Sequence, residues 1–157
     1  MPLPVALRPA VAWFSRTALF RRVGPTIMPP LERAWKTVGG RTPLSNLGVP
    51  SLVLHTTGAK SGLARDTELM YCPDGDEMLV TGSNFARESH PAWTANLLAN
   101  PDAAVTVRRR RVSVRAVLVV EADREATWTQ LERNWPGYRG YERTAGRELR
   151  IFRLTPR

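Results

Sequence analysis

Residues 103–120, AAVTVRRRRVSVRAVLVV, carry the pattern that decides the fold. On both sides of the arginine run, apolar residues recur at every second position: Val105, Val107, Val112, Val114, Ala116, Leu118 and Val120. A period of two is typical of a strand with one buried face. The stretch therefore predicts two long strands in a hairpin that bends at Arg109-Arg110.

Shorter segments of the same kind flank this hairpin. We predict strands at residues 51–57, 67–72, 78–82 and 148–154. The turn Pro73-Asp74-Gly75-Asp76 joins the second to the third, because Asp-Gly is a strong hairpin signal. Two helices interrupt the strands, one running from His90-Pro91 to Asn100 with Ser89 or His90 as its cap, the other capped by Asp123. About six strands without βαβ alternation indicate a mainly β (α+β) protein, built as a small antiparallel barrel.

Composition narrows the class of protein. The chain has 157 residues, the size of one domain, and 43% of them are apolar. One cysteine excludes an internal disulfide, and with two histidines it is too few for an ordinary structural zinc site. No apolar run approaches the roughly 20 residues of a transmembrane helix, and the N-terminus lacks a signal-peptide pattern. We expect a soluble cytoplasmic protein without a metal.

The net charge of +9 favours an anionic partner. Residues 1–40 are predicted to form a basic, helical segment that precedes the barrel of residues 41–157. This segment either packs on the barrel or lies on an anionic membrane, where Trp and Phe with Arg suit the interface, on the inner face of the plasma membrane. The run Arg108–Arg111 predicts a solvated hairpin tip, and the lack of an aromatic platform argues against nucleic acid.

Two loops are candidates for binding a ligand. In the loop Thr56–Gly62, two glycines surround Lys60, and Arg65 follows three residues later. Exposed backbone N–H groups and two cations can hold a phosphate or carboxylate, although a hairpin turn with solvated charges is the alternative. The stretch Gly82-Ser83-Asn84-Phe85 leads towards the predicted helix start at Pro91, where free N–H groups could meet a polar ligand. On that helix, Trp93 either forms an apolar wall or packs in the core.

The sequence lacks the residue sets of common catalytic machinery. His90 is predicted to be a cap or turn residue, His55 to be packed within a strand, and Cys72 has no histidine arranged to activate it. Paired carboxylates are not indicated, so a catalyst of this kind would need a cofactor to supply the chemistry. Tyr138 and Tyr141 lie in an aromatic, glycine-flanked loop that either closes over a flat ligand or packs on the barrel.

Taken in order, the motifs resemble the deazaflavin-dependent nitroreductase family. They are Thr57-Gly58-Ala59-Lys60-Ser61-Gly62 with Arg65, then Ser83-Asn84-Phe85, then His90-Pro91-Ala92-Trp93 with Asn96 and Asn100-Pro101. The resemblance extends from about Gly39 to Pro156. It implies a split β-barrel that binds the deazaflavin coenzyme F420 and passes a hydride to a quinone, a nitroaromatic or another electron-poor compound.

The resemblance also implies roles for individual residues. Lys60, Ser61 and Arg65 would hold the phosphate and glutamyl tail of the coenzyme, and Ser83 and Asn84 would lie by its ring. Pro91, Ala92, Trp93 and Asn96 would form the adjoining wall. Ser83, Tyr138 and Tyr141 would serve the reaction, the tyrosines by orienting the substrate. Some members have lysine at the position of Asn84 and tyrosine at that of Trp135.

Two alternatives stay open at this point. The same barrel could bind flavin mononucleotide (FMN), or it could be a basic, non-catalytic binder of a membrane or nucleic acid. The family resemblance also includes an N-terminal segment that can associate with membranes. Nothing in the sequence fixes an oligomeric interface.

Overall fold

The computed structural model describes Arg22 and residues 50–157, so the predictions for the N-terminal segment lie outside the described residues. Within residues 50–157 there are seven strands: β1 (Ser51–Thr57), β2 (Ala64–Met70), β3 (Cys72–Asp74), β4 (Glu77–Thr81), β5 (Asp102–Val107), β6 (Arg110–Leu118) and β7 (Ile151–Pro156). The same residues contain four helical elements: the 3-10 turn η2 (Asn84–Ala86), α4 (Ala92–Ala99), α5 (Glu121–Asn134) and α6 (Gly140–Ala145). The predicted mixture of many strands and a few short helices is confirmed.

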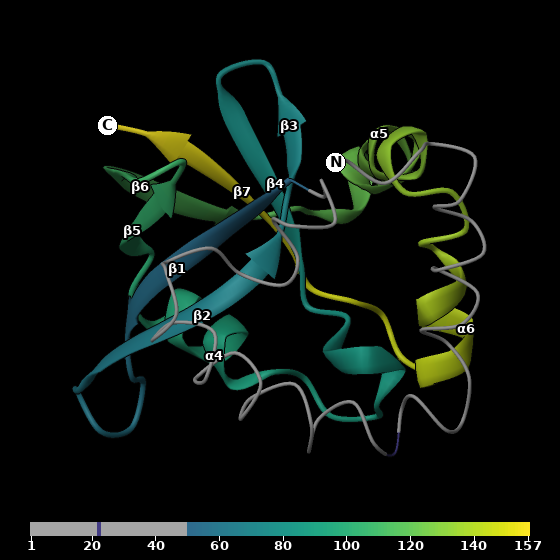
Figure 1. Ribbon diagram of the computed structural model, residues 1–157. Coiled ribbons are helices and arrows are strands. Elements are labelled where there is room, and N and C mark those ends of the chain that lie inside the picture. Colours follow the sequence, from purple (N-terminus) through teal and green to yellow (C-terminus); the bar gives the residue numbers. More distant parts are fainter. Residues whose placement is uncertain (1–21, 23–49) are drawn as a thin grey trace.

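All seven strands belong to one antiparallel sheet, in the order β2-β1-β5-β6-β7-β4-β3. The two edge strands, β2 and β3, are separated in the chain by Tyr71 alone. Its backbone N–H donates to the carbonyl oxygen of Pro50 at 3.0 Å. Because the chain joins opposite edges directly, the sheet must curl on itself, and it forms the predicted split barrel (Figure 1).

The long hairpin has the expected strands, but its turn lies one residue earlier than predicted. Val107 pairs with Arg110, which leaves Arg108 and Arg109 as the two turn residues, with φ of 47° and 67°. A two-residue turn with both residues left-handed has the twist that antiparallel strands need. The register buries Val105 and Val114 on the inner face.

Other boundaries also differ from the prediction. The second predicted strand is divided, because β2 ends at Met70 and Cys72 begins β3, while the last strand begins at Ile151. The cap of α4 is Pro91, which offers no side-chain bond, and Ser89 instead accepts hydrogen bonds from the Asn84 amide. Val120 occupies the cap position of α5, so Asp123 lies in its first turn, where a carboxylate still suits the helix dipole.

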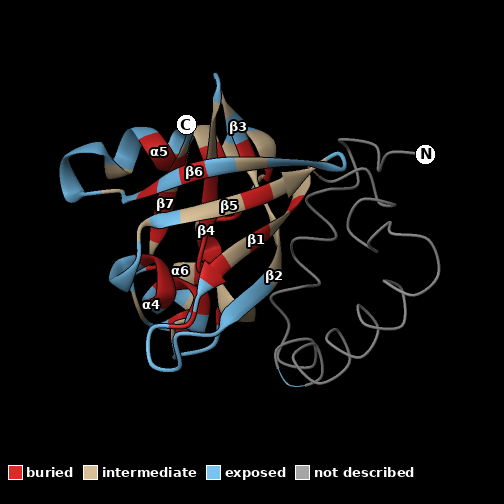
Figure 2. Ribbon diagram, turned by 90° about the vertical axis from the view of Figure 1, so that its left-hand side faces the viewer, coloured by how far each residue is buried: buried red, intermediate tan, exposed pale blue. Residues whose placement is uncertain are grey.

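Strands β4 and β7 are buried on both faces, and this divides the core in two (Figure 2). Leu79 and Ile151 point to one cluster, which α5 and α6 cover together with Trp128, Tyr138 and Tyr141. Val80 and Phe152, the next residues along, point into the barrel and meet Trp93 and Leu97 of α4. Two helical layers are therefore fixed to opposite faces of the same two strands.

Candidate functional site

The loop between β1 and β2 is a compact turn that presents three polar side chains to solvent. The Gly58 N–H donates to the Leu63 carbonyl at 2.8 Å, and the Gly62 N–H donates to the Gly58 carbonyl at 2.8 Å. A Cβ on Gly58 would lie 2.5 Å from the Ser61 hydroxyl and 3.3 Å from the Leu63 carbonyl oxygen, so a larger residue at this position would force the Ser61 side chain to move. Lys60, Ser61 and Arg65 are exposed around it.

Asn96 of α4 fastens this loop to the rest of the molecule. Its side-chain oxygen accepts a hydrogen bond from the Ala59 N–H at 2.9 Å. Its amide nitrogen donates to the Thr56 hydroxyl at 3.0 Å, and both Asn96 and Thr56 are buried. A buried amide with a donor and an acceptor both engaged holds its partners in one geometry. The helix therefore positions the backbone beside Lys60.

The other end of α4 meets the second candidate loop. The Gly82 N–H donates to the Arg150 carbonyl at 2.8 Å, and a Cβ on Gly82 would lie 2.8 Å from the Thr94 methyl group. Only glycine allows the backbone to approach α4 this closely. The α4 helix therefore joins both loops, with Pro91 and Thr94 near Gly82 and Asn96 near Ala59.

After Gly82 and Ser83 the chain enters an uncommon conformation. Asn84, Phe85 and Ala86 have φ of 45°, 54° and 57°, all in the left-handed region. Non-glycine residues adopt this region at a steric cost, and consecutive ones are rarer still. The Asn84 side-chain amide donates to the Ser89 carbonyl at 2.9 Å, which closes the loop on itself.

Arg147 binds this loop through its guanidinium group, and nothing in the sequence indicated this role for Arg147. Its guanidinium donates to the carbonyl oxygens of Gly82, Ser83, Arg87 and Ser89 at 3.0–3.4 Å. It also lies 3.0 Å from the Nδ1 atom of His90. Burial and the nearby cations Arg147 and Arg150 lower the pKa of His90, so the ring stays neutral and its Nδ1 accepts. His90 is thus a loop residue just before α4 and does not occupy the cap position that was one of its predicted roles.

The aromatic loop lies against the same turn from the side of α6. Tyr138 and Tyr141 are buried and meet edge to face, with ring centroids 5.4 Å apart, and Trp128 meets Tyr138 in the same way at 6.1 Å. Burial is the largest influence on the Tyr138 hydroxyl and raises its pKa to about 12, although the Ser83 and Thr81 hydroxyls nearby act in the opposite sense. The hydroxyl is therefore protonated at neutral pH.

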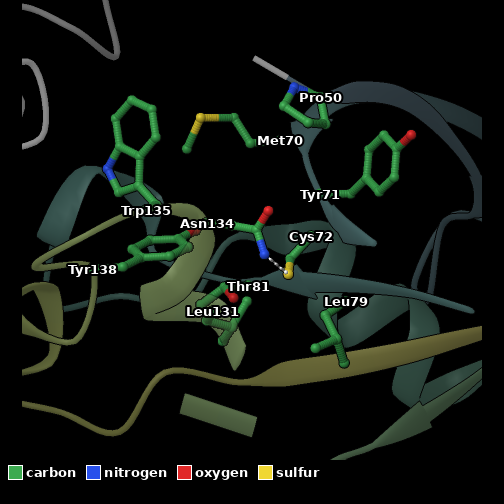
Figure 3. Close-up of a pocket in the computed structure, with 10 residues that line it drawn as sticks. All are labelled: Pro50, Met70, Tyr71, Cys72, Leu79, Thr81, Leu131, Asn134, Trp135 and Tyr138. Carbon is green, nitrogen blue, oxygen red and sulfur yellow. Dashed lines mark hydrogen bonds between the residues drawn. The ribbon is translucent and has the colours of Figure 1, made fainter. Parts of the chain in front are cut away.

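A small pocket with a cavity volume of about 30 Å³, partly open to solvent, lies beside Tyr138 (Figure 3). Its walls are mostly apolar and include Met70, Leu79 and Trp135. The Trp135 indole N–H has no hydrogen-bond partner among residues 50–157. Cys72 lines the pocket as well, where the Asn134 amide donates to its sulfur at 2.9 Å. Burial, with a smaller influence from Asp74, raises the Cys72 pKa to about 11, so the thiol is not activated.

The chain is similar to proteins of a known family. The family model for F420H(2)-dependent quinone reductases matches residues 31–156. A quinone reductase of that type from Mycobacterium tuberculosis is 34% identical over 143 residues, which cover 88% of this chain and 96% of the relative. The protein belongs to the F420H(2)-dependent quinone reductase family.

Further relatives agree with this family. A putative F420H(2)-dependent quinone reductase of Mycobacterium bovis has the same identity and coverage. A solved F420-H2 dependent reductase aligns with a TM-score of 0.60 and 27% identity, covering 67% of this chain and 93% of its own. The expectations of an F420-dependent oxidoreductase and of a split barrel are confirmed at the level of the family. Coenzyme F420, rather than FMN, is the cofactor that the family name specifies.

The residues expected to serve an F420H(2)-dependent quinone reductase fall into two groups. Lys60, Ser61, Arg65 and Ala92 are exposed, and Ser83, Asn84 and Pro91 are half-buried, so all seven are placed where a ligand can reach them. The second group, Trp93, Asn96, Tyr138 and Tyr141, is buried. Trp93 packs on Phe152 with ring centroids 5.9 Å apart, and therefore belongs mainly to the core.

No group of three potential metal ligands occurs in residues 50–157. His55 donates or accepts at both ring nitrogens, 2.6 Å from Asp66 and 2.8 Å from the Thr106 hydroxyl, and so ties β1 to both neighbouring strands. Among the described helices, none is both long and apolar enough to span a bilayer.

Proposed function

We propose that this protein uses reduced coenzyme F420 to reduce a quinone, and that conjugated electron-poor compounds such as nitroaromatics can take the quinone's place. The observation that carries the proposal is the position of α4. This one helix fastens the cationic Lys60 loop at Asn96 and approaches the Gly82–Ala86 loop at Pro91 and Thr94. Motifs that are separate in the sequence are thus joined into one surface within a family that uses F420.

The first part of this surface suits the acidic end of the coenzyme. Lys60 is a cation on the exposed, pre-ordered loop and Ser61 adds a hydroxyl there, while Arg65 is a second exposed cation near the start of β2. We assign these three side chains to the phosphate and glutamyl carboxylates. Charge-assisted hydrogen bonds to such groups are stronger than neutral ones. Gly62 leaves the backbone of this turn open to close approach, because a Cβ there would meet no atom within 4 Å.

The second part suits the flat ring. Ser83 and Asn84 follow the close approach of Gly82 to α4, and Pro91, Ala92 and the outer edge of Trp93 would form the adjoining wall. Asn96 would act by holding the loop. When bound in its reduced form, the coenzyme supplies a hydride from its C5 atom.

The electron-poor substrate is assigned to the surface beside Tyr138, where this small pocket opens. The walls of the pocket are mostly apolar, and the Tyr138 hydroxyl, which is protonated because its pKa is about 12, is the donor among the lining residues that we assign to the substrate. A quinone oxygen gains negative charge as it is reduced, so donors aimed at that oxygen favour the reaction. Tyr141 contacts the Tyr138 ring edge to face and thereby orients it.

Titration of oxidised F420 into the protein, followed by coenzyme fluorescence, tests the proposal, with FMN as the control ligand. We expect saturable binding of F420 and reduction of quinones by F420H2. The variant Lys60→Glu should bind F420 far more weakly, because it places a negative charge against an anionic tail. Binding of FMN in place of F420 would refute the cofactor, and unchanged affinity in Lys60→Glu would refute the tail site.

We further propose that residues 1–40 form a basic helical segment, separate from the barrel of 41–157, that holds the protein on the cytoplasmic face of an anionic membrane. Support comes from the sequence, in which Arg16, Arg21 and Arg22 lie near Trp13 and Phe14. Replacing the three arginines by glutamine should release the protein from anionic vesicles while leaving quinone reduction in solution unchanged. Equal vesicle binding by the variant would contradict this proposal.

A further inference from the structure

We propose that Arg147 is a positioning residue for coenzyme binding, which sets the shape of the Ser83–Ala86 turn without itself touching the ligand. This inference rests on the proposed function, because that function assigns Ser83 and Asn84 to the ring of F420. Arg147 donates to four backbone carbonyls of residues 82–89, at 3.1 Å for Gly82, 3.4 Å for Ser83, 3.0 Å for Arg87 and 3.0 Å for Ser89.

The turn needs such support because its backbone is strained. Within the turn, the Ala86 N–H donates to the Ser83 carbonyl at 2.9 Å, and the Arg87 N–H donates to the Asn84 carbonyl at 3.1 Å. The turn also contains three successive residues with left-handed backbone conformation, among them Phe85 and the fully buried Ala86. A strained backbone of this kind persists only where its surroundings fix it. Arg147 supplies that fixation from outside the turn.

The chemistry of the clamp requires arginine. A guanidinium presents five N–H donors in a rigid plane, which can reach several carbonyls at once, whereas a lysine has three donors on one atom. Arg147 also donates to the neutral ring of His90, at the last residue before Pro91. Within residues 50–157, no carboxylate lies within ion-pair distance of Arg147, so its partners are backbone oxygens and this ring.

The position of Arg147 also connects the two halves of the site. Gly146, with φ of +65°, ends α6 and changes the direction of the chain, so that the Arg147 side chain reaches the carbonyl oxygens of the Ser83–Ala86 turn and its neighbours. The α6 helix carries Tyr141, and Glu142 next to it pairs with Arg124 and accepts from the Leu149 N–H at 2.9 Å. The substrate side and the coenzyme side therefore share one anchored segment, residues 141–149.

Three variants test this role: Arg147→Ala, Arg147→Lys and, as the matched control, Arg143→Ala, which removes an exposed arginine from α6, four residues before Arg147. We expect Arg147→Ala to raise the Kd for F420 by about tenfold or more. The KM for F420H2 should rise with it, while the KM for quinone stays within about twofold. Arg147→Lys should fall between wild type and alanine, and Arg143→Ala should match wild type.

Chemical rescue separates positioning from general loss of fold. Millimolar guanidinium should restore part of the F420 affinity of Arg147→Ala by occupying the vacated site, and sodium chloride at equal concentration should not. The role is overturned if Kd is unchanged in a folded Arg147→Ala, or if neither guanidinium nor lysine restores any affinity. Should Arg147→Ala fail to fold, wild-type affinity in Arg147→Lys overturns it. A wild-type protein that binds no F420 would instead refute the proposed function.

Discussion

Asn96 offers the sharpest test of how the candidate site is held together. The substitution Asn96→Leu keeps most of the side-chain volume but removes two buried hydrogen bonds, to the Ala59 N–H and the Thr56 hydroxyl. The Thr56 hydroxyl loses a donor inside the protein, while the exposed Ala59 can bind water. Losses of this kind sum to about 2–3 kcal/mol of unfolding free energy. For a chain of this length, that corresponds to a decrease in Tm of about 5–10 °C.

The same substitution should weaken coenzyme binding, because the Lys60 loop loses its anchor. Ordering even one residue of a released loop on binding costs about 1–2 kcal/mol, so the Kd for F420 should rise about tenfold. Thermal unfolding followed by circular dichroism measures the first effect, and fluorescence titration of F420 measures the second. Asn100→Ala, at the exposed end of the same helix, should change neither.

Thr56→Val separates loop anchoring from core stability. It removes the contact with the Asn96 amide nitrogen but leaves the bond from the Ala59 N–H to the Asn96 oxygen. We expect a lower Tm with Kd within about twofold of wild type. The reasoning is refuted if Asn96→Leu lowers Tm and leaves Kd unchanged, or if Thr56→Val weakens binding as strongly as Asn96→Leu.

Three further predictions concern other parts of the molecule. Gly82→Ala should lower the unfolding free energy by about 1–3 kcal/mol, because the new methyl group overlaps the Thr94 methyl group. The double variant Gly82→Ala with Thr94→Ser should recover part of this loss. Denaturant titration measures both changes. Hydrogen bonds from Thr155 and Arg153 lower the pKa of Glu77, so its contribution to stability is present above its unfolded pKa and is lost as the pH falls. The unfolding free energies of wild type and Glu77→Gln should therefore converge in acid. Curves of unfolding free energy against pH that stay parallel for the two proteins would contradict this role of Glu77. Tyr138→Phe should lower kcat about 100-fold and leave the affinity for F420 unchanged. In the pH profile of kcat, an inflection below about pH 10 that disappears in this variant would contradict the raised pKa of Tyr138.

The strands could be predicted because their signals are local. Alternating valines indicate which face of β5 and β6 is buried, and the glycine of the predicted Pro73–Asp76 turn falls between β3 and β4, where Gly75 and Asp76 are the two turn residues. The hairpin tip was displaced by one residue, since four successive arginines offer no preference for where the two left-handed residues fall. Local sequence thus specifies a hairpin but leaves the position of its turn to the register of the paired strands.

The parts of the site that sequence analysis missed depend on contacts between distant residues. Arg147 meets backbone carbonyls about 60 residues earlier in the chain, and carbonyls carry no residue-type signal. Likewise, nothing in Asn84-Phe85-Ala86 favours left-handed backbone at Phe85 or Ala86. Asn96 was predicted as a ligand contact, yet its side chain faces the protein's own Ala59 and Thr56.

These contacts indicate how a site with exposed cations can bind a ligand specifically. Lys60 and Arg65 lie in solvent, where each ion pair is weakened by water and salt. A loop already ordered by Asn96 and a turn already ordered by Arg147 remove the entropy that binding would otherwise have to supply. Affinity for F420 should therefore depend on the buried anchors as much as on the exposed charges. Adding salt should weaken binding in wild type and in Asn96→Leu by the same factor, because the anchor changes loop order and leaves the number of charges unchanged.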